Sequence, residues 1–300
     1  MTSREVCGIC GGTNLEVLYR GRIRLGRFGN FSQEDHTVWK CAQCLAGFLP
    51  NTLGQSELYY ESQAYREEVD VGADVADYFR LHDGEQVFNL AVTGVAVFRD
   101  KMVADVGCGG GSFLDVVKGY ARGAVAIEPS RIFRESLIGR GYVAYSYSRD
   151  ALSDHRGRVD VVTSFSVLEH VQDPLAFLRE IRDLLAPDGK MILSTPNAGD
   201  ALLEALPDTY PSFFFRKAHL WYFNSISLKN LLERAGYEDI RIIPRQRFGL
   251  SNFLGWMRDA SPQGHKRISF VTEAMDAIWK VELERTQRCD YLYAEASLTS

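Results

Sequence analysis

The chain is 300 residues long, with 46% hydrophobic and 24% charged residues. This composition supports a substantial buried core in one large domain or two smaller ones, and it excludes a wholly disordered protein. The formal net charge of −5 argues against a broad nucleic-acid interface, although the arginines between residues 20 and 27 leave a local basic patch open.

Two cysteine pairs stand near the N-terminus, Cys7-x-x-Cys10 and Cys41-x-x-Cys44. The chain has no apolar run near the ~20 residues of a membrane helix and no signal-peptide core, so we expect a cytoplasmic protein with reduced thiols and no membrane partner. Two such pairs can complete a tetrahedral Zn²⁺ site, whereas a redox motif and unrelated buried thiols are the alternatives. We interpret residues 1–50 as a module with structural zinc, because four thiolates leave no open position for catalysis.

Residues 51–98 show a helical pattern with two aromatic clusters, Tyr59-Tyr60-x-x-x-x-Tyr65 and Tyr78-Phe79. We interpret this segment as a helical lid or linker between the zinc module and the C-terminal two thirds of the chain. Ordinary helix packing explains the aromatic residues equally well.

An apolar run at 101–106 predicts a strand, and the glycine-rich turn Asp105-x-Gly107-x-Gly109-x-Gly111 ends it. Residues 113–117 then open a helix. Glycines in such a turn let the backbone pass close to a ligand and adopt angles that other residues avoid. A strand, a glycine turn and a helix in this order are typical of a cofactor site.

The turn favours one class of cofactor over another. The dinucleotide fingerprint needs a third glycine where Ser112 stands, and the Asp105 carboxylate would repel a pyrophosphate. A positively charged ligand without phosphate fits, as S-adenosylmethionine does. Glu128 follows a second predicted strand near 123–127 and is placed to accept hydrogen bonds from both ribose hydroxyls. The alternative is an ordinary tight turn and a surface acid.

The remaining elements continue an alternation of strands and helices. Asp173 caps a predicted helix whose buried stripe is Leu175, Leu178, Ile181 and Leu185. A 244–288 insert is too long for a hairpin and covers the active-site mouth or forms a homodimer face. The other predicted elements are strands near 159–164, 190–194, 239–243 and 290–296 and helices at 228–235 and 268–285. Together they predict an α/β fold with a doubly wound, seven-stranded, mostly parallel sheet whose last strand is antiparallel.

The motifs resemble those of class I S-adenosylmethionine-dependent methyltransferases. The resemblance rests on Asp105–Gly111, Glu128-Pro129, Val159–His170, Asp173-Pro174 and Leu185–Pro196. It implies a Rossmann-like methyltransferase domain at 99–300 and S-adenosylmethionine as cofactor. The residues expected to contact the cofactor are Asp105, Gly107, Gly109, Gly111, Glu128, Asp150 and Ser164. Asp150 is expected to accept from the adenine amino group, and a solvated loop acid is the alternative.

A zinc module before this fold is similar to the nucleotide-sugar C-methyltransferase group, although the C-terminal domain of that group is lacking. The segment 213–225 resembles the group's motif Y-H-E-H-L-x-Y-F-S, with His219 on the second histidine. It departs at Arg216, Lys217 and Ala218. Because C-methylation needs several of the lost groups, we expect O- or N-methylation of a small hydroxylated acceptor, a sugar or nucleotide sugar.

His219 and His170 are the two candidates for the base that takes the acceptor's proton. We favour His219, because His170 fits a structural role near the cofactor better than the role of base. Plain packing is the alternative for the aromatic segment around His219. Arg216 and Lys217 beside aromatic residues could hold a phosphate of a nucleotide sugar. Two other functions stay open, namely methylation of RNA or protein recruited by the zinc module and a non-catalytic binding protein.

Overall fold

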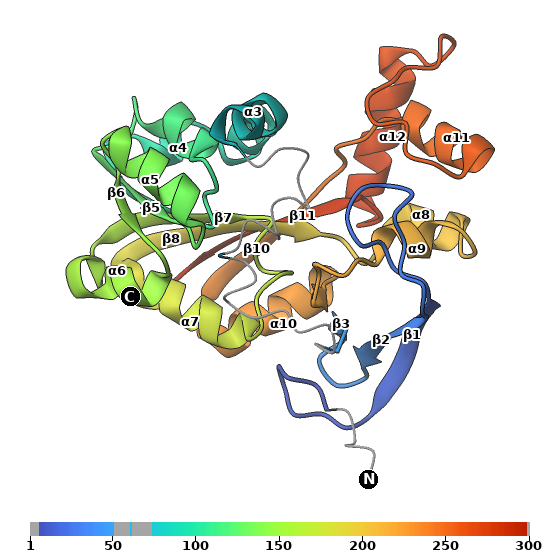
Figure 1. Cartoon of the computed structure of the whole chain (residues 1–300), viewed down its shortest axis with the longest axis horizontal. Helices are drawn as coiled ribbons and strands as arrows, with labels where there is room; N and C mark the ends of the chain where they lie inside the picture. Colours follow the sequence, from blue (N-terminus) through green and yellow to red (C-terminus); the bar gives the residue numbers. More distant parts are fainter. Residues whose placement is uncertain (1–5, 51–60, 62–73, 299–300) are drawn as a thin grey trace. The chain divides into compact units, whose positions relative to one another are not determined.

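The computed structural model describes residues 6–50, 61 and 74–298 (Figure 1). The chain divides into two compact units. The first unit comprises Met1–Asn51, Thr195–Leu231 and Ile242–Tyr293, and the second comprises Thr52–Ser194, Leu232–Arg241 and Ala294–Ser300. The predicted boundaries at residues 50, 98, 244 and 288 stay a prediction.

The first unit contains a four-stranded sheet of order β1-β2-β3-β9, paired antiparallel throughout. Its strands are β1 (Leu15–Gly21), β2 (His36–Cys41), β3 (Gly47–Phe48) and β9 (Trp221–Tyr222). Phe48 pairs with Trp221, and their rings lie 5.8 Å apart. A segment more than 170 residues downstream therefore completes the sheet of the N-terminal cysteine module.

Among the described residues, four helices lie wholly within the first unit. They are α8 (Ala201–Ala205), α9 (Tyr210–Phe214), α11 (Leu250–Asp259) and α12 (Glu273–Arg285). The buried Trp256 of α11 lies 5.0 Å from the ring of Tyr210 and 4.9 Å from that of Phe213, so the 244–288 insert contributes to an aromatic core. Helix α12 begins five residues later than predicted, because Thr272 caps it by accepting from the Met275 amide at 3.2 Å.

The second unit is built on a seven-stranded sheet of order β10-β11-β8-β7-β4-β5-β6, which confirms the predicted doubly wound, mostly parallel fold. Its strands are β4 (Met102–Val106), β5 (Gly123–Ile127), β6 (Val143–Tyr145), β7 (Val159–Phe165), β8 (Leu185–Pro196), β10 (Glu238–Arg245) and β11 (Tyr291–Ser297). The four neighbouring pairs from β8 to β6 are parallel. The chain reverses its direction across the sheet between β4 and β7, where ligands bind in such folds.

Helices cover both faces of the parallel strands (Figure 1). On one face lie α3 (Val75–Thr93), α4 (Ser112–Val117) and α5 (Arg131–Gly139), and on the other lie α6 (Ser148–His155) and α7 (Pro174–Leu184). The predicted cap of α7 is present, since Asp173 accepts from the amides of Leu175 and Ala176 at 3.0 and 2.9 Å. Helix α10 (Ser225–Ala235) starts three residues before its predicted start, because Asn224 and Ser227 cap it reciprocally. Among the described helices, none combines the length and apolar character needed to cross a membrane.

Candidate cofactor site

A cavity of about 420 Å³ lies at the carboxyl ends of β4, β5, β6 and β7, and all of its lining residues belong to the second unit. Parallel strands end at one edge of the sheet, so the loops that follow them meet there. The lining residues that carry the argument below are Gly107, Glu128, Tyr147, Arg149, Ser166, His170, Gln172 and Phe177.

Backbone conformation and lack of space both require glycine in this turn. Gly107, Gly109 and Gly111 have φ angles of 74°, 55° and 85°, in the left-handed region that other residues avoid. A Cβ on Gly107 would also lie 2.4 Å from a methyl carbon of Val167. The Gly107 amide donates to the Ile127 carbonyl at 2.7 Å, which ties the turn to the end of β5.

Helix α3 packs on the outer side of this turn. The Tyr78 ring lies so close that a Cβ on Gly109 would approach its hydroxyl oxygen to 2.3 Å. The same ring stacks on His82 and contacts Phe133, with centroids 4.4 and 4.9 Å apart. One predicted aromatic cluster therefore packs directly against the cofactor turn, and the other, at residues 59–65, lies outside the described residues.

Glu128 lies at the cavity wall and is only 2% exposed. Its Oε2 accepts from the Gly109 amide and its Oε1 from the Ser130 amide, both at 2.8 Å. Two backbone donors fix the carboxylate in place, as expected for a group that must be oriented before a ligand arrives. The structure thus brings the predicted acid and the predicted turn together.

Asp105 and Ser164 lie behind the turn and do not line the cavity. The Asp105 carboxylate is 3% exposed and accepts from the Thr163 hydroxyl at 2.7 Å. Burial, with a smaller effect of the Glu128 charge, raises the pKa of Asp105 to about 7, and the Thr163 hydrogen bond opposes this rise. The Ser164 hydroxyl donates to the Val106 carbonyl at 3.1 Å. These two predicted contact residues shape the turn from inside the sheet.

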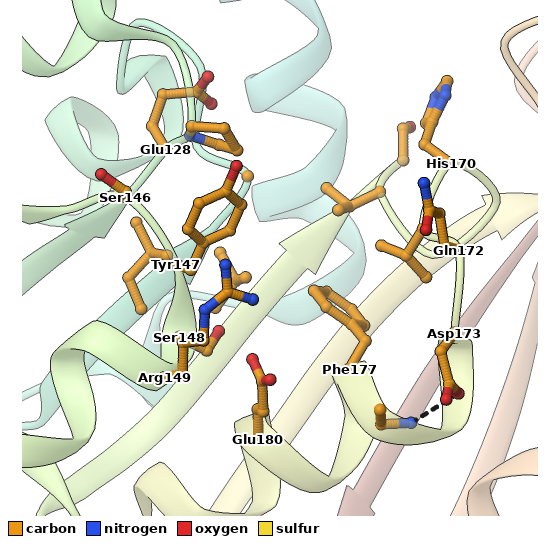
Figure 2. A pocket seen from close by; sticks show the side chains of 18 residues that line it. Glu128, Ser146, Tyr147, Ser148, Arg149, His170, Gln172, Asp173, Phe177 and Glu180 are labelled. Atoms are coloured by element: carbon orange, nitrogen blue, oxygen red, sulfur yellow. Dashed lines mark hydrogen bonds between the residues drawn. The ribbon is translucent and has the colours of Figure 1, made fainter. Parts of the chain in front are cut away.

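One wall of the cavity comes from the loop after β6, where Tyr147 and Arg149 lie on the same side as Glu128 (Figure 2). The Arg149 guanidinium carbon is 4.2 Å from the centre of the Tyr147 ring. Neither residue was among the predicted contacts, because no strand was predicted at residues 143–145. The predicted adenine acceptor, Asp150, is exposed and accepts from the Tyr147 amide at 3.0 Å as a helix cap. Among the described residues, Asp150 is not part of the cavity wall.

The opposite wall follows β7 and carries His170, Gln172 and Phe177 (Figure 2). Ser166 enters this loop with a φ of 57°, a strained angle of the kind found at ligand sites. The His170 amide donates to the Val167 carbonyl at 2.9 Å, so a tight turn positions this histidine. His219, the other predicted base, belongs to the first unit, where it is 7% exposed and its amide donates to the Arg216 carbonyl at 3.1 Å.

The four predicted zinc ligands gather in the first unit. The Sγ atoms of Cys7 and Cys44 lie 3.5 Å apart, as do those of Cys10 and Cys41, and all four lie within 4.8 Å of one another. A tetrahedron with Zn–S bonds of about 2.3 Å has S–S edges of about 3.8 Å, so the donor set fits Zn²⁺. All four cysteines are free thiols in the structure.

Comparisons with known proteins agree with this geometry. Residues 88–242 match the family model described as "Methyltransferase domain". The chain is 34% identical over 122 residues to a "Ubiquinone biosynthesis O-methyltransferase" of Haemophilus ducreyi, which covers 37% of this chain and 51% of that protein. It is 30% identical over 159 residues to a "tRNA U34 carboxymethyltransferase" of Aeromonas salmonicida, covering 50% and 48%. The chain thus spans about half the length of these curated relatives.

Among solved structures, a SAM-dependent methyltransferase from Archaeoglobus fulgidus aligns with a TM-score of 0.50 and 19% identity. The alignment covers 73% of this chain and 96% of that one. A possible histamine N-methyltransferase from Thermotoga maritima aligns with the same score and 15% identity, over 74% and 95% of the two chains. At these identities the likeness shows a shared fold.

Proposed function

The chain belongs to the methyltransferase domain family, and from this premise we propose that it transfers a methyl group from S-adenosylmethionine to a small hydroxylated acceptor, a sugar or nucleotide sugar. The observation that carries the cofactor assignment is the orientation of Glu128. Its two oxygens are held by backbone amides at the wall of a cavity that the glycine turn borders.

The residues of the cavity divide the task of binding the cofactor. The sulfonium supplies an already activated methyl group, so the chain's own work is positioning. Glu128 accepts hydrogen bonds from the ribose hydroxyls. Tyr147 and Arg149 provide an aromatic and cationic surface for the adenine ring of the cofactor. Asp105 is buried behind the turn, where its negative charge would attract the cofactor's sulfonium through a medium of low dielectric constant.

We propose His219 as the base that accepts the acceptor's proton, with His170 holding the loop after β7 beside the cofactor. In support, His219 is the histidine retained from the sugar-methyltransferase motif, while His170 lines the cavity. O- or N-methylation needs a single base, whereas C-methylation of a keto sugar needs additional groups that Lys217 and Ala218 replace.

Zinc at Cys7, Cys10, Cys41 and Cys44 is proposed as a structural ion. The four thiols fit it, and three of them are at most 3% exposed. With every position of the tetrahedron filled by sulfur, the ion would hold the loops around β1 to β3 together and take no part in methyl transfer.

Methylation of RNA is the second candidate, because one relative is named for tRNA. The test is transfer of a labelled methyl group from S-adenosylmethionine to parallel panels of nucleotide sugars, phenols and unmodified tRNA. Transfer to a nucleotide sugar supports the proposal. Transfer to tRNA alone, or to a phenol alone, replaces the acceptor, and cofactor binding without transfer to any panel favours the non-catalytic function.

A further inference from the structure

Two arginines meet side by side in the first unit. Arg24 and Arg216 form a parallel backbone bridge, so their side chains leave the backbone at the same level of neighbouring extended segments. The Arg24 amide donates to the Phe215 carbonyl at 3.0 Å, and its carbonyl accepts from the Lys217 amide at 2.8 Å. The Arg216 amide donates to the Tyr222 hydroxyl at 3.0 Å. Three hydrogen bonds therefore fix the two positions.

The surroundings of this pair are aromatic rather than acidic. The guanidinium carbon of Arg24 lies 4.2 Å above the centre of the Phe213 ring, and that ring belongs to the core around Trp256. The charged or ionisable groups that act on Arg24 are Arg216, Tyr210 and Tyr222. Within the described part of the chain, no carboxylate forms an ion pair with Arg24 or Arg216.

Each of the two guanidinium groups has a hydrogen-bond donor that is not satisfied within the described residues. The Nε atoms of Arg24 and Arg216 are buried and have no hydrogen-bond partner among the described residues. Burial and, to a smaller extent, the charge of Arg216 lower the pKa of Arg24 to about 9. Two half-buried like charges without a counter-ion and two unsatisfied buried Nε donors are each unfavourable, and one bound anion would relieve both.

We propose that Arg24 and Arg216 form a binding site for a phosphate or diphosphate group. Paired guanidinium forks match the oxygens of phosphates, and a phosphate accepts hydrogen bonds from several N–H groups at once. As part of the methyl acceptor, this anion makes the substrate a sugar phosphate or nucleotide sugar, a step that rests on the proposed function. The sequence predicted Arg216 and Lys217 as the phosphate-binding pair. In the structure the partner of Arg216 is instead Arg24, from the N-terminal residues 1–50.

A small phosphorylated molecule fits this site better than a nucleic acid. The two charges are half-buried and confined to one point, whereas nucleic-acid binding proteins spread many cations along a surface. The net charge of −5 opposes a polyanion of that kind as well.

The experiment measures the melting temperature of the whole chain with and without sodium pyrophosphate, at constant ionic strength and without S-adenosylmethionine. Pyrophosphate raises the melting temperature of the natural protein by about 2–4 °C. Arg24→Met and Arg216→Met abolish this rise. Without pyrophosphate these variants melt no lower than the natural protein, because each removes a half-buried charge that lacks a counter-ion. The matched control is Arg27→Met, which makes the same charge change at an exposed position and keeps the full rise.

Arg216→Lys keeps the charge but loses the fork, and we expect about tenfold weaker pyrophosphate binding by calorimetry. UDP and inorganic phosphate are compared in the same way, and tighter binding of UDP than of phosphate supports a nucleotide sugar. An equal rise in all variants, no rise with any phosphate, or preferential binding of an RNA oligonucleotide overturns the site. Because none of these arms contains S-adenosylmethionine, their failure leaves the proposed methyl transfer standing, and loss of cofactor binding would leave this site standing.

Discussion

Asp105 and Glu128 are both buried acids at the cofactor turn, and their partners give them different roles. Glu128 accepts from two backbone amides and lines the cavity, whereas Asp105 accepts from one hydroxyl and faces the interior of the sheet. Fewer donors and full burial leave the charged form of Asp105 poorly stabilised, so its pKa rises to about 7. We therefore expect Glu128 to orient the ligand and Asp105 to respond to the ligand's positive charge.

The raised pKa of Asp105 predicts a pH-dependent affinity for S-adenosylmethionine. Below pH 7 the free protein holds Asp105 protonated, and the cofactor's positive charge must expel that proton on binding. The affinity should therefore increase as the pH rises toward about 7 and then level off. Calorimetry in buffers of different ionisation enthalpy measures both the affinity and the proton release. Asp105→Asn, which keeps the acceptor for Thr163, should abolish the dependence, and an unchanged dependence would contradict this role.

The raised pKa of Asp105 also predicts how the free energy of unfolding depends on pH. An Asp105 pKa raised from 3.8 to about 7 means that the folded state keeps a proton which the unfolded chain has lost between these values. The contribution to stability is complete below pH 3.8 and disappears as the pH rises through 7, by on the order of 4 kcal/mol. Urea denaturation of the cofactor-free protein and of Asp105→Asn across this range checks the sign. A steeper loss in the variant would count against the assignment.

His219 and His170 are distinguished by kinetics. If His219 is the base, His219→Ala lowers kcat by about 10²–10⁴-fold and leaves the affinity for S-adenosylhomocysteine nearly constant. His170→Ala should instead weaken cofactor binding, because His170 lines the cavity. Single-turnover rates with the acceptor identified by the panels give the comparison. A His219 variant with most of its activity would assign this residue to packing.

At the scale of elements, the strongest sequence patterns were the most reliable. The predicted strands at 101–106 and 123–127 correspond to β4 and β5, since their apolar runs are buried on both faces and bounded by turns. The three-residue β6 was missed, and with it Tyr147 and Arg149, because so short a strand leaves no periodic pattern. Strand β9 was missed for another reason: its pairing with β3 depends on contacts distant in sequence.

The metal prediction concerns the sheet of the first unit. Elemental analysis should find one zinc ion per chain, and Cys41→Ser should lose it, because three remaining thiols make a weaker site. The strand β2 ends at Cys41, so loss of the ion should also lower the melting temperature. Cys289→Ser, a change at a fully buried cysteine outside the cluster, is the control and should retain the zinc. A metal-free protein of unchanged stability would refute the structural ion.

At the scale of the whole molecule, the predicted order of strands was sufficient to locate the cofactor cavity, without knowledge of the side-chain positions. The chain reverses across the sheet between β4 and β7, and the loops at that edge contain Gly107, Glu128 and His170. The acceptor side was much less predictable from sequence. Its candidate residues, Arg24 and Arg216, are 192 positions apart and are joined only by the fold.

Binding of S-adenosylhomocysteine by calorimetry tests the cofactor assignment most directly. We expect one site per chain and a loss of about 1–3 kcal/mol of binding free energy in Glu128→Gln, because the carboxylate is replaced by a group with one acceptor oxygen. Glu135→Gln, the same change at an exposed position of α5, should bind like the natural protein. Unchanged binding in Glu128→Gln, or tight binding of NAD with none of S-adenosylhomocysteine, would contradict the account.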